Sequence, residues 1–207
     1  MAIATWTDLQ GAVTNWLSHS NFSSRYGEFA TLFEAALNRK LRTHDMERSA
    51  VAFILSGTDN IYGGLSADYL ENRSIYLQTS PKKTVLKPAS IDIIRSQYDY
   101  SGIPKFFAIL EDDIVIGPYA NGDYVAILEY YAKIPSIETN NTNWLLTKYP
   151  DVYLYGMLMQ CAIYDHDPEN EARYEARVNK IFDDIMIDDR KAKWNSRPSI
   201  EILGSTP

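Results

Sequence analysis

Hydrophobic residues in the first part of the chain recur every three or four positions, the spacing that places them on one face of an α-helix. This pattern predicts one helix over residues 6–18 and a second over residues 25–44, separated by a polar stretch. Thr5 or Thr7 can cap the first helix, because a hydroxyl at the N-cap accepts a hydrogen bond from a free N–H of the first turn. The chain is therefore expected to begin with a pair of helices.

The middle of the chain changes to a period of two, which is typical of half-buried strands. Glu111 and Asp112 separate two such stretches as the turn of a hairpin would. Ser90 can cap a short helix over residues 90–98. These elements indicate a small β subdomain. Its predicted strands cover residues 51–55, 73–79, 105–110, 113–117 and 123–134, with a short partner at 84–86.

Helical spacing returns after Asn143 and predicts two more helices. Residues 151–164 are apolar on almost every side, so this helix should form the buried centre of a bundle. Pro150 suits its first turn, where no backbone N–H is needed. Gly156 and Gln160 lie one turn apart in it and indicate a close contact with another helix.

The last helix is expected to have Asp167 as its N-cap and Pro168 at its first position, and to end near Trp194. The pairs Asp183-Asp184 and Asp188-Asp189 fall on its polar side. They are interpreted as a solvated face, or as the lining of a channel if copies of the chain form a ring. Its buried stripe is predicted to consist of Tyr174, Val178, Ile181, Phe182 and Ile185.

Together these elements predict an α+β fold, in which a helical bundle formed by the N- and C-terminal helices carries an inserted small antiparallel β subdomain. In the C-terminal tail, Ile200 and Ile202 would share one face of a strand. This segment is either donated to a partner as an added strand, or packs on its own subdomain or is disordered. The expected divisions are 1–46 for the N-terminal helices, 47–138 for the β-rich insert, 139–194 for the C-terminal helices and 195–207 for the extended tail.

Composition and charge narrow the possible functions. The chain has 207 residues, of which 45% are hydrophobic, so it can bury a core. Its net charge of −7 and the lack of a basic stripe argue against a nucleic-acid binder, although an acidic wall would let DNA slide past. Its 15 tyrosines suit surfaces that are buried against partners. Neither a secretory signal nor a membrane-spanning segment is expected.

The sequence has no phosphate-binding loop, dinucleotide fingerprint or nucleophile elbow, so no catalytic residue, metal site or cofactor is predicted. His19, His44 and His166 each lie at or near a predicted helix end or loop, where an exposed histidine is common. The run Asp165-His166-Asp167 is interpreted as the start of a helix rather than a metal site, because adjacent residues on a turn do not all point at one ion.

Two further features have chemical alternatives. Glu111, Asp112 and Asp113 form an acidic triplet, and a pair of acids in a cleft can act as general acid and base. A solvated turn is the preferred interpretation, with a small hydrolase that uses Glu111 or Asp113 as an alternative. Cys161 has apolar neighbours on a buried helix and is the single cysteine, so it is interpreted as an inert core thiol that makes no intrachain disulfide.

Four stretches, taken together, resemble the head-to-tail adaptor family of tailed bacteriophages, akin to tail tubular protein A and related head-completion adaptors. The most specific is the run from residue 143 to residue 156, NWLLTKYPDVYLYG. Ser66 stands where the family would carry proline, and the loop over 98–102 is rich in tyrosine, which leaves the subfamily open. The other stretches are LSADYLE at 65–71, PKFFAI at 104–109 followed by Tyr130-Tyr131-Ala132, and DRKAKW at 189–194 followed by Ile200-Glu201-Ile202.

The resemblance implies a homo-oligomeric ring of twelve copies beneath the portal protein, which joins the portal to tail or nozzle proteins and extends the DNA channel. DNA would pass through the lumen without specific binding. The protein would belong to the neck of the virion, after assembly in the host cytoplasm and without a membrane. The family's C-terminal segment contacts the portal, which here points to Arg197, Ser199, Ile200, Glu201, Ile202 and Leu203.

The alternative to an adaptor is a carbohydrate- or receptor-binding module of a virion. Tyrosine-rich strands could stack on sugars in such a module. The predicted C-terminal helix pair distinguishes the two, because β-type binding modules usually lack one.

Overall fold

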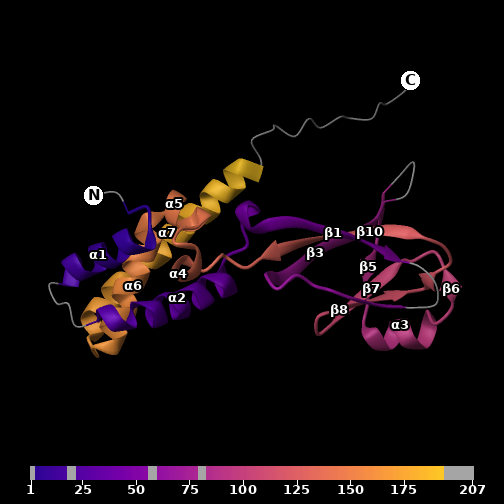
Figure 1. The fold of residues 1–207 in the computed structure, drawn as a ribbon, viewed down its shortest axis with the longest axis horizontal. Coiled ribbons are helices and arrows are strands. Elements are labelled where there is room, and N and C mark those ends of the chain that lie inside the picture. The colour runs from indigo at the N-terminus through magenta and orange to yellow at the C-terminus, as the bar shows by residue number, and fades with distance from the viewer. Residues whose placement is uncertain (1–2, 18–21, 56–59, 79–82, 194–207) are drawn as a thin grey trace, which may run out of the picture. The chain divides into compact units, whose positions relative to one another are not determined.

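The computed structural model describes residues 3–17, 22–55, 60–78 and 83–193. The chain divides into two compact units, which are shown in Figure 1. A helical unit is formed by residues 1–45 and 134–207, and a sheet unit is formed by residues 46–133. The α+β class expected from the sequence is confirmed.

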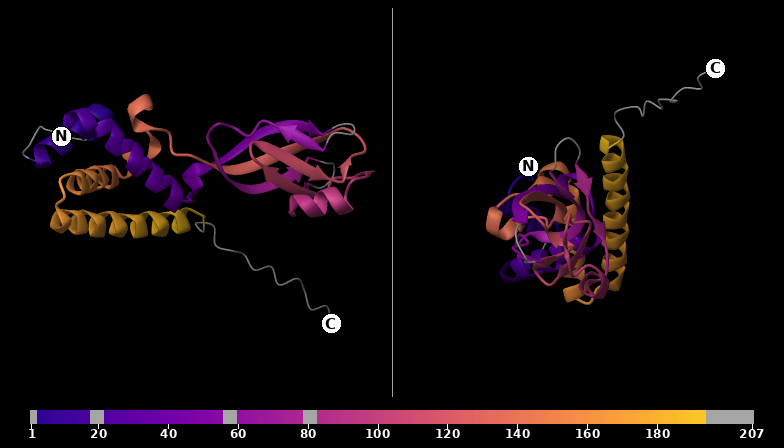
Figure 2. Two further views of the ribbon diagram at one scale, coloured as in Figure 1. Left: turned by 90° about the horizontal axis from the view of Figure 1, so that it is seen from below. Right: turned by 90° about the vertical axis from the view of Figure 1, so that its right-hand side faces the viewer.

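The helical unit combines helices from both ends of the chain. Two of them, α6 and α7, lie side by side in both Figure 1 and Figure 2, and α6 also packs against α1, α2 and α5. The unit's helices are α1 (Trp6–Leu17), the short 3-10 helix η1 (Ser23–Arg25), α2 (Tyr26–Lys40), α4 (Ile137–Asn140), α5 (Trp144–Lys148), α6 (Pro150–Tyr164) and α7 (Pro168–Lys193). A second 3-10 helix, η2 (His44–Met46), follows α2 along the chain.

Local capping explains where these helices begin. Thr5 and Asp8 bond each other's backbone at the start of α1: Asp8 N–H donates to Thr5 Oγ1 at 3.2 Å, and Thr5 N–H donates to Asp8 Oδ2 at 3.1 Å. At the start of α7, the N–H of Asn170 donates to Asp167 Oδ1 at 3.1 Å, which confirms the predicted cap.

Helix α6 is the centre of the helical unit, as its apolar sequence predicts. Tyr153, Met157 and Leu158 are fully buried in it. The close contact expected near Gly156 also exists, because a methyl group added at this position would overlap the ring of Phe33 in α2. The predicted stripe on α7 is buried at its last four positions, whereas Tyr174 is half-buried.

The second predicted helix differs from the one observed. It was expected to run over 25–44, but α2 ends at Lys40 and Leu41 is already extended, with φ −93° and ψ 137°. The apolar stripe misled the prediction, because Leu41 continues it into the core although the backbone has left the helix. Asn38 stays in α2, where its side-chain oxygen accepts the N–H of Ile134 at 2.9 Å.

The sheet unit contains a four-stranded antiparallel sheet in the order β1-β10-β3-β4. A second sheet has the order β2-β8-β7-β5, in which only β5 and β7 are parallel, and a short parallel pair joins β6 to β9. The strands are β1 (Glu47–Leu55), β2 (Ile61–Gly63), β3 (Tyr69–Leu77), β4 (Thr84–Val85), β5 (Lys87–Pro88), β6 (Ser101–Gly102), β7 (Phe106–Leu110), β8 (Asp113–Gly117), β9 (Tyr119–Ala120) and β10 (Tyr124–Ala132).

Successive side chains of β7 and β8 point to opposite faces of their sheet and so contribute to two separate hydrophobic clusters in the sheet unit. Phe107, Ile114 and Ile116 join a cluster with residues of β1, β3 and β10, so the two four-stranded sheets share one core. Ala108 and Val115 point to the other side, where they pack against Ile94 of α3 (Ile91–Gln97). The predicted cap of this helix is present, since Ser90 Oγ accepts the N–H of Ile93 at 3.4 Å.

Candidate functional site

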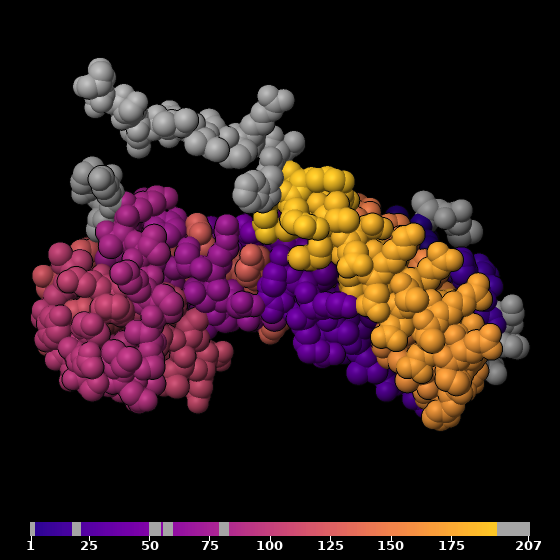
Figure 3. Space-filling view, turned by 180° about the vertical axis from the view of Figure 1, so that it is seen from behind, coloured from indigo at the N-terminus to yellow at the C-terminus, as the bar shows by residue number. Residues whose placement is uncertain are grey.

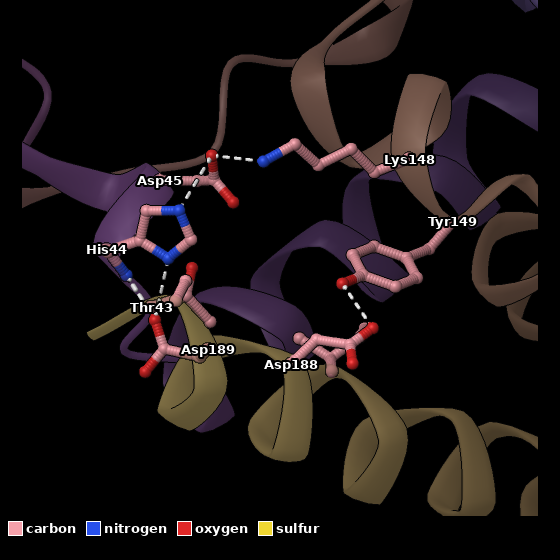
Figure 4. A pocket seen from close by; sticks show the side chains of 9 residues that line it. Thr43, His44, Asp45, Lys148, Tyr149, Asp188 and Asp189 are labelled. Carbon is pink, nitrogen blue, oxygen red and sulfur yellow. Dashed lines mark hydrogen bonds and ion pairs between the residues drawn. The ribbon is translucent and has the colours of Figure 1, made fainter. Parts of the chain in front are cut away.

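The helical unit contains a pocket of about 430 Å³ where the segment after α2 passes the last turns of α7. Figure 4 shows its side chains, which come from that segment, from the junction of α5 and α6, and from α7. The lining residues are Thr43, His44, Asp45, Lys148, Tyr149, Ile185, Asp188, Asp189 and Ala192.

Asp189 joins the end of α7 to the segment after α2. Its Oδ1 accepts the backbone N–H of His44 at 2.6 Å and lies 2.9 Å from His44 Nδ1, while its Oδ2 lies 2.9 Å from Lys193 Nζ. Burial raises the pKa of this carboxyl, but the hydrogen bonds from Lys193 and His44 outweigh burial and hold the pKa below its ordinary value. Asp189 is therefore ionised at neutral pH, where it links segments 145 residues apart.

The other side of the pocket carries two further polar contacts. Lys148 Nζ lies 2.6 Å from Asp45 Oδ1, and the hydroxyl of Tyr149 donates to Asp188 Oδ2 at 3.3 Å. Burial raises the pKa of Tyr149, and the negative charge of Asp188 raises it further. This phenol therefore stays protonated at neutral pH and acts as a hydrogen-bond donor, not as a nucleophile.

A second polar network lies in the core of the helical unit. Glu34 Oε1 accepts the N–H of Ile137 at 2.7 Å and the hydroxyl of Tyr153 at 3.1 Å. Asn143 Nδ2 donates to the same Tyr153 oxygen at 2.7 Å, and Asn143 Oδ1 caps α5 by accepting the N–H of Leu146 at 2.8 Å. Burial raises the pKa of Glu34, although the hydrogen bonds from Ile137 and Tyr153 act in the opposite direction. The network ties α2, α5 and α6 together.

The structure corrects the interpretation of Asp189. The sequence placed it on a solvated face with Asp183, Asp184 and Asp188, and those three are exposed. Figure 3 shows α7, coloured orange to yellow, at the surface of the helical unit. Asp189 is only 5% exposed, because His44 and Lys193 bind its carboxylate. His44 lies at a helix end, as predicted, but its contact with Asp189 was missed, since no local pattern links residues so distant in the sequence.

The acidic and histidine-containing turn before α7 has a structural role. Asp167 caps the helix, and its side chain also accepts Asn170 Nδ2 at 2.6 Å. These bonds hold the pKa of Asp167 below its ordinary value. His166 is exposed and has a positive φ of 55°. Across the described ranges, no group of three or more His, Cys, Asp or Glu side chains could hold a metal ion.

The remaining candidates are not among the residues that line the pocket. Glu111 and Asp112 are exposed in the turn between β7 and β8, and Asp113 begins β8. Cys161 is buried in α6, and burial raises the pKa of its thiol to about 12, which agrees with an inert core residue. His19 and the predicted portal contacts lie outside the described residues; the latter are Arg197, Ser199, Ile200, Glu201, Ile202 and Leu203.

Residues quoted for the family resemblance make defined contacts. Tyr130 stacks on Tyr69 with ring centroids 5.7 Å apart, and its hydroxyl donates to Asp68 Oδ1 at 2.9 Å. Two of the four stretches thus meet in the sheet unit. In the helical unit, Asn143 and Gly156 of the most specific stretch serve the polar network and the α2–α6 contact. The resemblance therefore rests on side chains that organise the fold.

Polar side chains join distant segments of the chain in both networks of the helical unit, where they stabilise the fold. In a comparison with known families, residues 4–200 match the family described as SU10 adaptor protein. The chain belongs to this family and is a phage adaptor protein, a structural component of the virion. No curated protein matches the chain.

Membrane association was not expected from the sequence. Within the part of the chain that the structure describes, no helix combines the length and the apolar character needed to cross a bilayer.

Proposed function

We propose that this adaptor assembles as a homo-oligomeric ring of twelve copies in the phage neck, where it joins the portal protein to tail or nozzle proteins and extends the DNA channel. The match of residues 4–200 to the adaptor family carries the proposal. The likeness to tail tubular protein A belongs to the same proposal, as does assembly in the host cytoplasm. The net charge of −7 supports a lumen through which DNA passes without specific binding.

The contact with the portal is assigned to residues 195–207. Support comes from the way α7 ends. Asp189 and Lys193 lie in its last turns, and the Asp189–His44 contact holds these turns against the rest of the helical unit. A tail that leaves from a fixed helix end can be presented to a partner at a defined position, which reduces the ordering cost of binding. Ile200 and Ile202 would then supply the apolar side chains of an added strand.

Deleting residues 195–207 tests this assignment. The truncated protein is expected to keep its melting temperature, because the core of the helical unit lies within residues 3–193. It should no longer bind purified portal in a sedimentation or pull-down assay. In the matched control, a Gly/Ser sequence of the same length replaces residues 195–207, and this variant should also fail to bind the portal. A second control keeps Ile200 and Ile202 within the Gly/Ser sequence and should recover part of the portal binding. Undiminished portal binding by the truncated chain would contradict the assignment.

Ring formation is tested separately by native mass spectrometry. The isolated chain is expected to be largely monomeric, and a complex of twelve copies should form only after portal is added. A stable ring without portal would refute the expected order of assembly. A complex with a different copy number would refute the stoichiometry and leave the portal contact intact.

A further inference from the structure

The sheet unit carries opposite charges at the two ends of one strand, β7. Lys105 precedes this strand, Glu111 and Asp112 follow it in the turn to β8, and all three side chains are exposed. The five residues of β7 separate the two ends by about 17 Å, at about 3.3 Å per residue. Asp113, which begins β8, adds a third carboxylate to the acidic turn.

Two further bases gather at the basic end. The N–H of Lys87 donates to the carbonyl of Lys105 at 2.8 Å and so fixes β5 beside the start of β7. Arg95 lies in the last turn of α3, and Tyr98 at the end of this helix packs on Phe106 with ring centroids 4.5 Å apart. Figure 1 shows α3 beside β7. Among the described residues, no ion pair is made by any of these three exposed bases.

The bases are in excess at this end. Two exposed acids, Asp99 and Asp123, lie in the turns that flank the short pair of β6 and β9. They leave the three bases without a contact to a carboxylate, whereas Glu111 and Asp112 at the other end have no ion-pair partner within the described ranges. Each end of β7 therefore has charges that its own chain does not neutralise.

Exposed apolar side chains accompany the charges at both ends. Tyr100 and Ile103 at the basic end are 48% and 53% exposed, and Leu110 beside the acidic turn is 40% exposed. Tyr98 also lies against Tyr100, with ring centroids 6.4 Å apart, so three aromatic rings are grouped with Arg95. Exposed aromatic groups next to arginine are typical of surfaces that become buried against another protein.

We propose that the acidic turn of one copy contacts the basic end of the sheet unit of the next copy, and that this contact repeats around the ring. The inference rests on the proposed function, because it names the surface through which the copies of the ring meet. A second copy fits because each end lacks the charge that the other end supplies. The ends lie at opposite termini of β7, so the contact joins two different surfaces and is head-to-tail, the type that closes into a ring.

Duplex DNA is another partner that a basic surface could meet. DNA would be repelled by the acidic turn, however, and phosphates do not explain why Leu110 is exposed beside it. Exposed charges around a small apolar centre orient association more than they strengthen it. A contact of this kind agrees with an isolated chain that is largely monomeric and with copies that gather once the portal holds them together.

The first test is charge reversal in the isolated full-length protein. Self-association is measured by sedimentation equilibrium at high protein concentration in about 0.01 M salt, where the Debye length is about 30 Å. Lys105→Glu and Asp112→Lys should each weaken association at least about tenfold, because each places like charges opposite one another. These two variants change the net charge in opposite directions, so a loss in both cannot come from the net charge.

A chain with both changes provides the rescue. Its net charge equals that of the unmodified protein, and its association should return to within about threefold, because a glutamate again meets a lysine on the next copy. Compensation within one chain is excluded by the separation along β7. Glu175→Lys is the matched control for Asp112→Lys, since Glu175 is exposed on α7, and it should not weaken association. Unchanged melting temperatures confirm that the variants are folded.

Species larger than dimers are expected, because a head-to-tail contact leaves one surface free at each end. Association that stops at dimers would overturn the head-to-tail contact. Unchanged association in both single variants, failure of the double variant to recover, or no association of the unmodified chain would each overturn the charge pairing. Binding of a short DNA duplex that is lost in Lys105→Glu, without self-association, would assign the basic end to DNA instead.

The second test adds the portal and counts copies by native mass spectrometry. Complete rings should be lost with either single variant and recovered with the double variant. Normal rings with both single variants would overturn the inference and leave the proposed function standing. No complex of the unmodified chain with the portal would reject the proposed function, whereas a rescue in the isolated protein would still support the contact between copies.

Discussion

The absence of a side chain at Gly156 determines how helices α2 and α6 pack. The α2–α6 contact requires it, because any Cβ at this position would overlap the Phe33 ring. The surrounding residues are fully buried, so neither helix can move aside without disturbing the core.

Gly156→Ala should therefore destabilise the protein, although alanine favours helices more than glycine does. We expect a loss of about 1–3 kcal/mol in the free energy of unfolding, the usual cost of overpacking a core. Gly11→Ala is the matched control. Gly11 is exposed in α1 with nothing within 4 Å of an added Cβ, so this change should stabilise the protein by up to about 1 kcal/mol. Urea unfolding measures both, and two changes of the same sign would contradict the packing argument.

The burial of the Glu34 carboxyl lowers the free energy of unfolding at neutral pH. Its folded pKa is raised, mainly by burial, so folding disfavours its charged form. The free energy of unfolding is therefore fully retained below the unfolded pKa of Glu34, about 4.3, and it decreases as the pH rises from that value through the folded pKa.

Glu34→Gln should accordingly raise stability by about 1 kcal/mol at pH 7 and have little effect near pH 3.5. The glutamine oxygen can still accept the Ile137 N–H and the Tyr153 hydroxyl. Glu28→Gln is the control: Glu28 is 59% exposed on the same helix and should show no such pH-dependent gain. Thermal melting at the two pH values provides the measurement, and a gain independent of pH would show that the charge of Glu34 is not the cause.

At the scale of elements, the Asp189 carboxylate links the end of α7 to the segment after α2. Asp189 has a folded pKa below its ordinary value, so its contribution to stability is present above the unfolded pKa of about 3.9 and is lost as the pH falls through the folded pKa. This behaviour is opposite in sign to that of Glu34, because here the bonds to Lys193 and His44 outweigh burial.

Asp189→Asn should lower stability by about 1–2 kcal/mol at pH 7, because it weakens the charge-assisted hydrogen bonds to His44 and Lys193. The difference from the unmodified protein should shrink below pH 4. Hydrogen exchange should also speed up at the amides of the last two turns of α7. Asp183→Asn, at an exposed position of the same helix, should change neither measurement. An undiminished difference at pH 3 would contradict the role of the charge.

At the scale of the whole molecule, the sheet unit has the features of an independent domain. The chain enters this unit at Met46 and leaves it at Lys133. Glu47 pairs with Tyr131 in neighbouring antiparallel strands, so the two ends of the unit lie close together. Its two hydrophobic clusters are formed by residues of the unit itself.

Residues 46–133 expressed alone should therefore fold and unfold cooperatively. Dispersed amide signals in an NMR spectrum and a single thermal transition are the expected observations. Tyr130→Phe in this fragment removes the bond to Asp68 but keeps the stacking on Tyr69, and should lower stability by about 1 kcal/mol. A fragment without cooperative unfolding would show that the sheet unit depends on the helical unit.

The elements that could be predicted were those set by neighbouring residues. Helix starts at Thr5, Ser90 and Asp167 follow from hydrogen bonds that reach three residues along the chain. The hairpin around Glu111 and the buried character of α6 follow from periodicity, because side-chain direction repeats with the backbone. The prediction was wrong at the end of α2, where the apolar pattern continued beyond the helix.

The sequence by itself thus determined the class of fold and most of its helices and strands, since those depend on interactions within a few residues. Only the tertiary structure decided which distant residues meet. It placed Phe33 against Gly156 and buried Asp189 between His44 and Lys193, and it formed the parallel pairing of β5 with β7. The physical reason is that the energy of these contacts depends on the path of the chain in space, which no local spacing encodes.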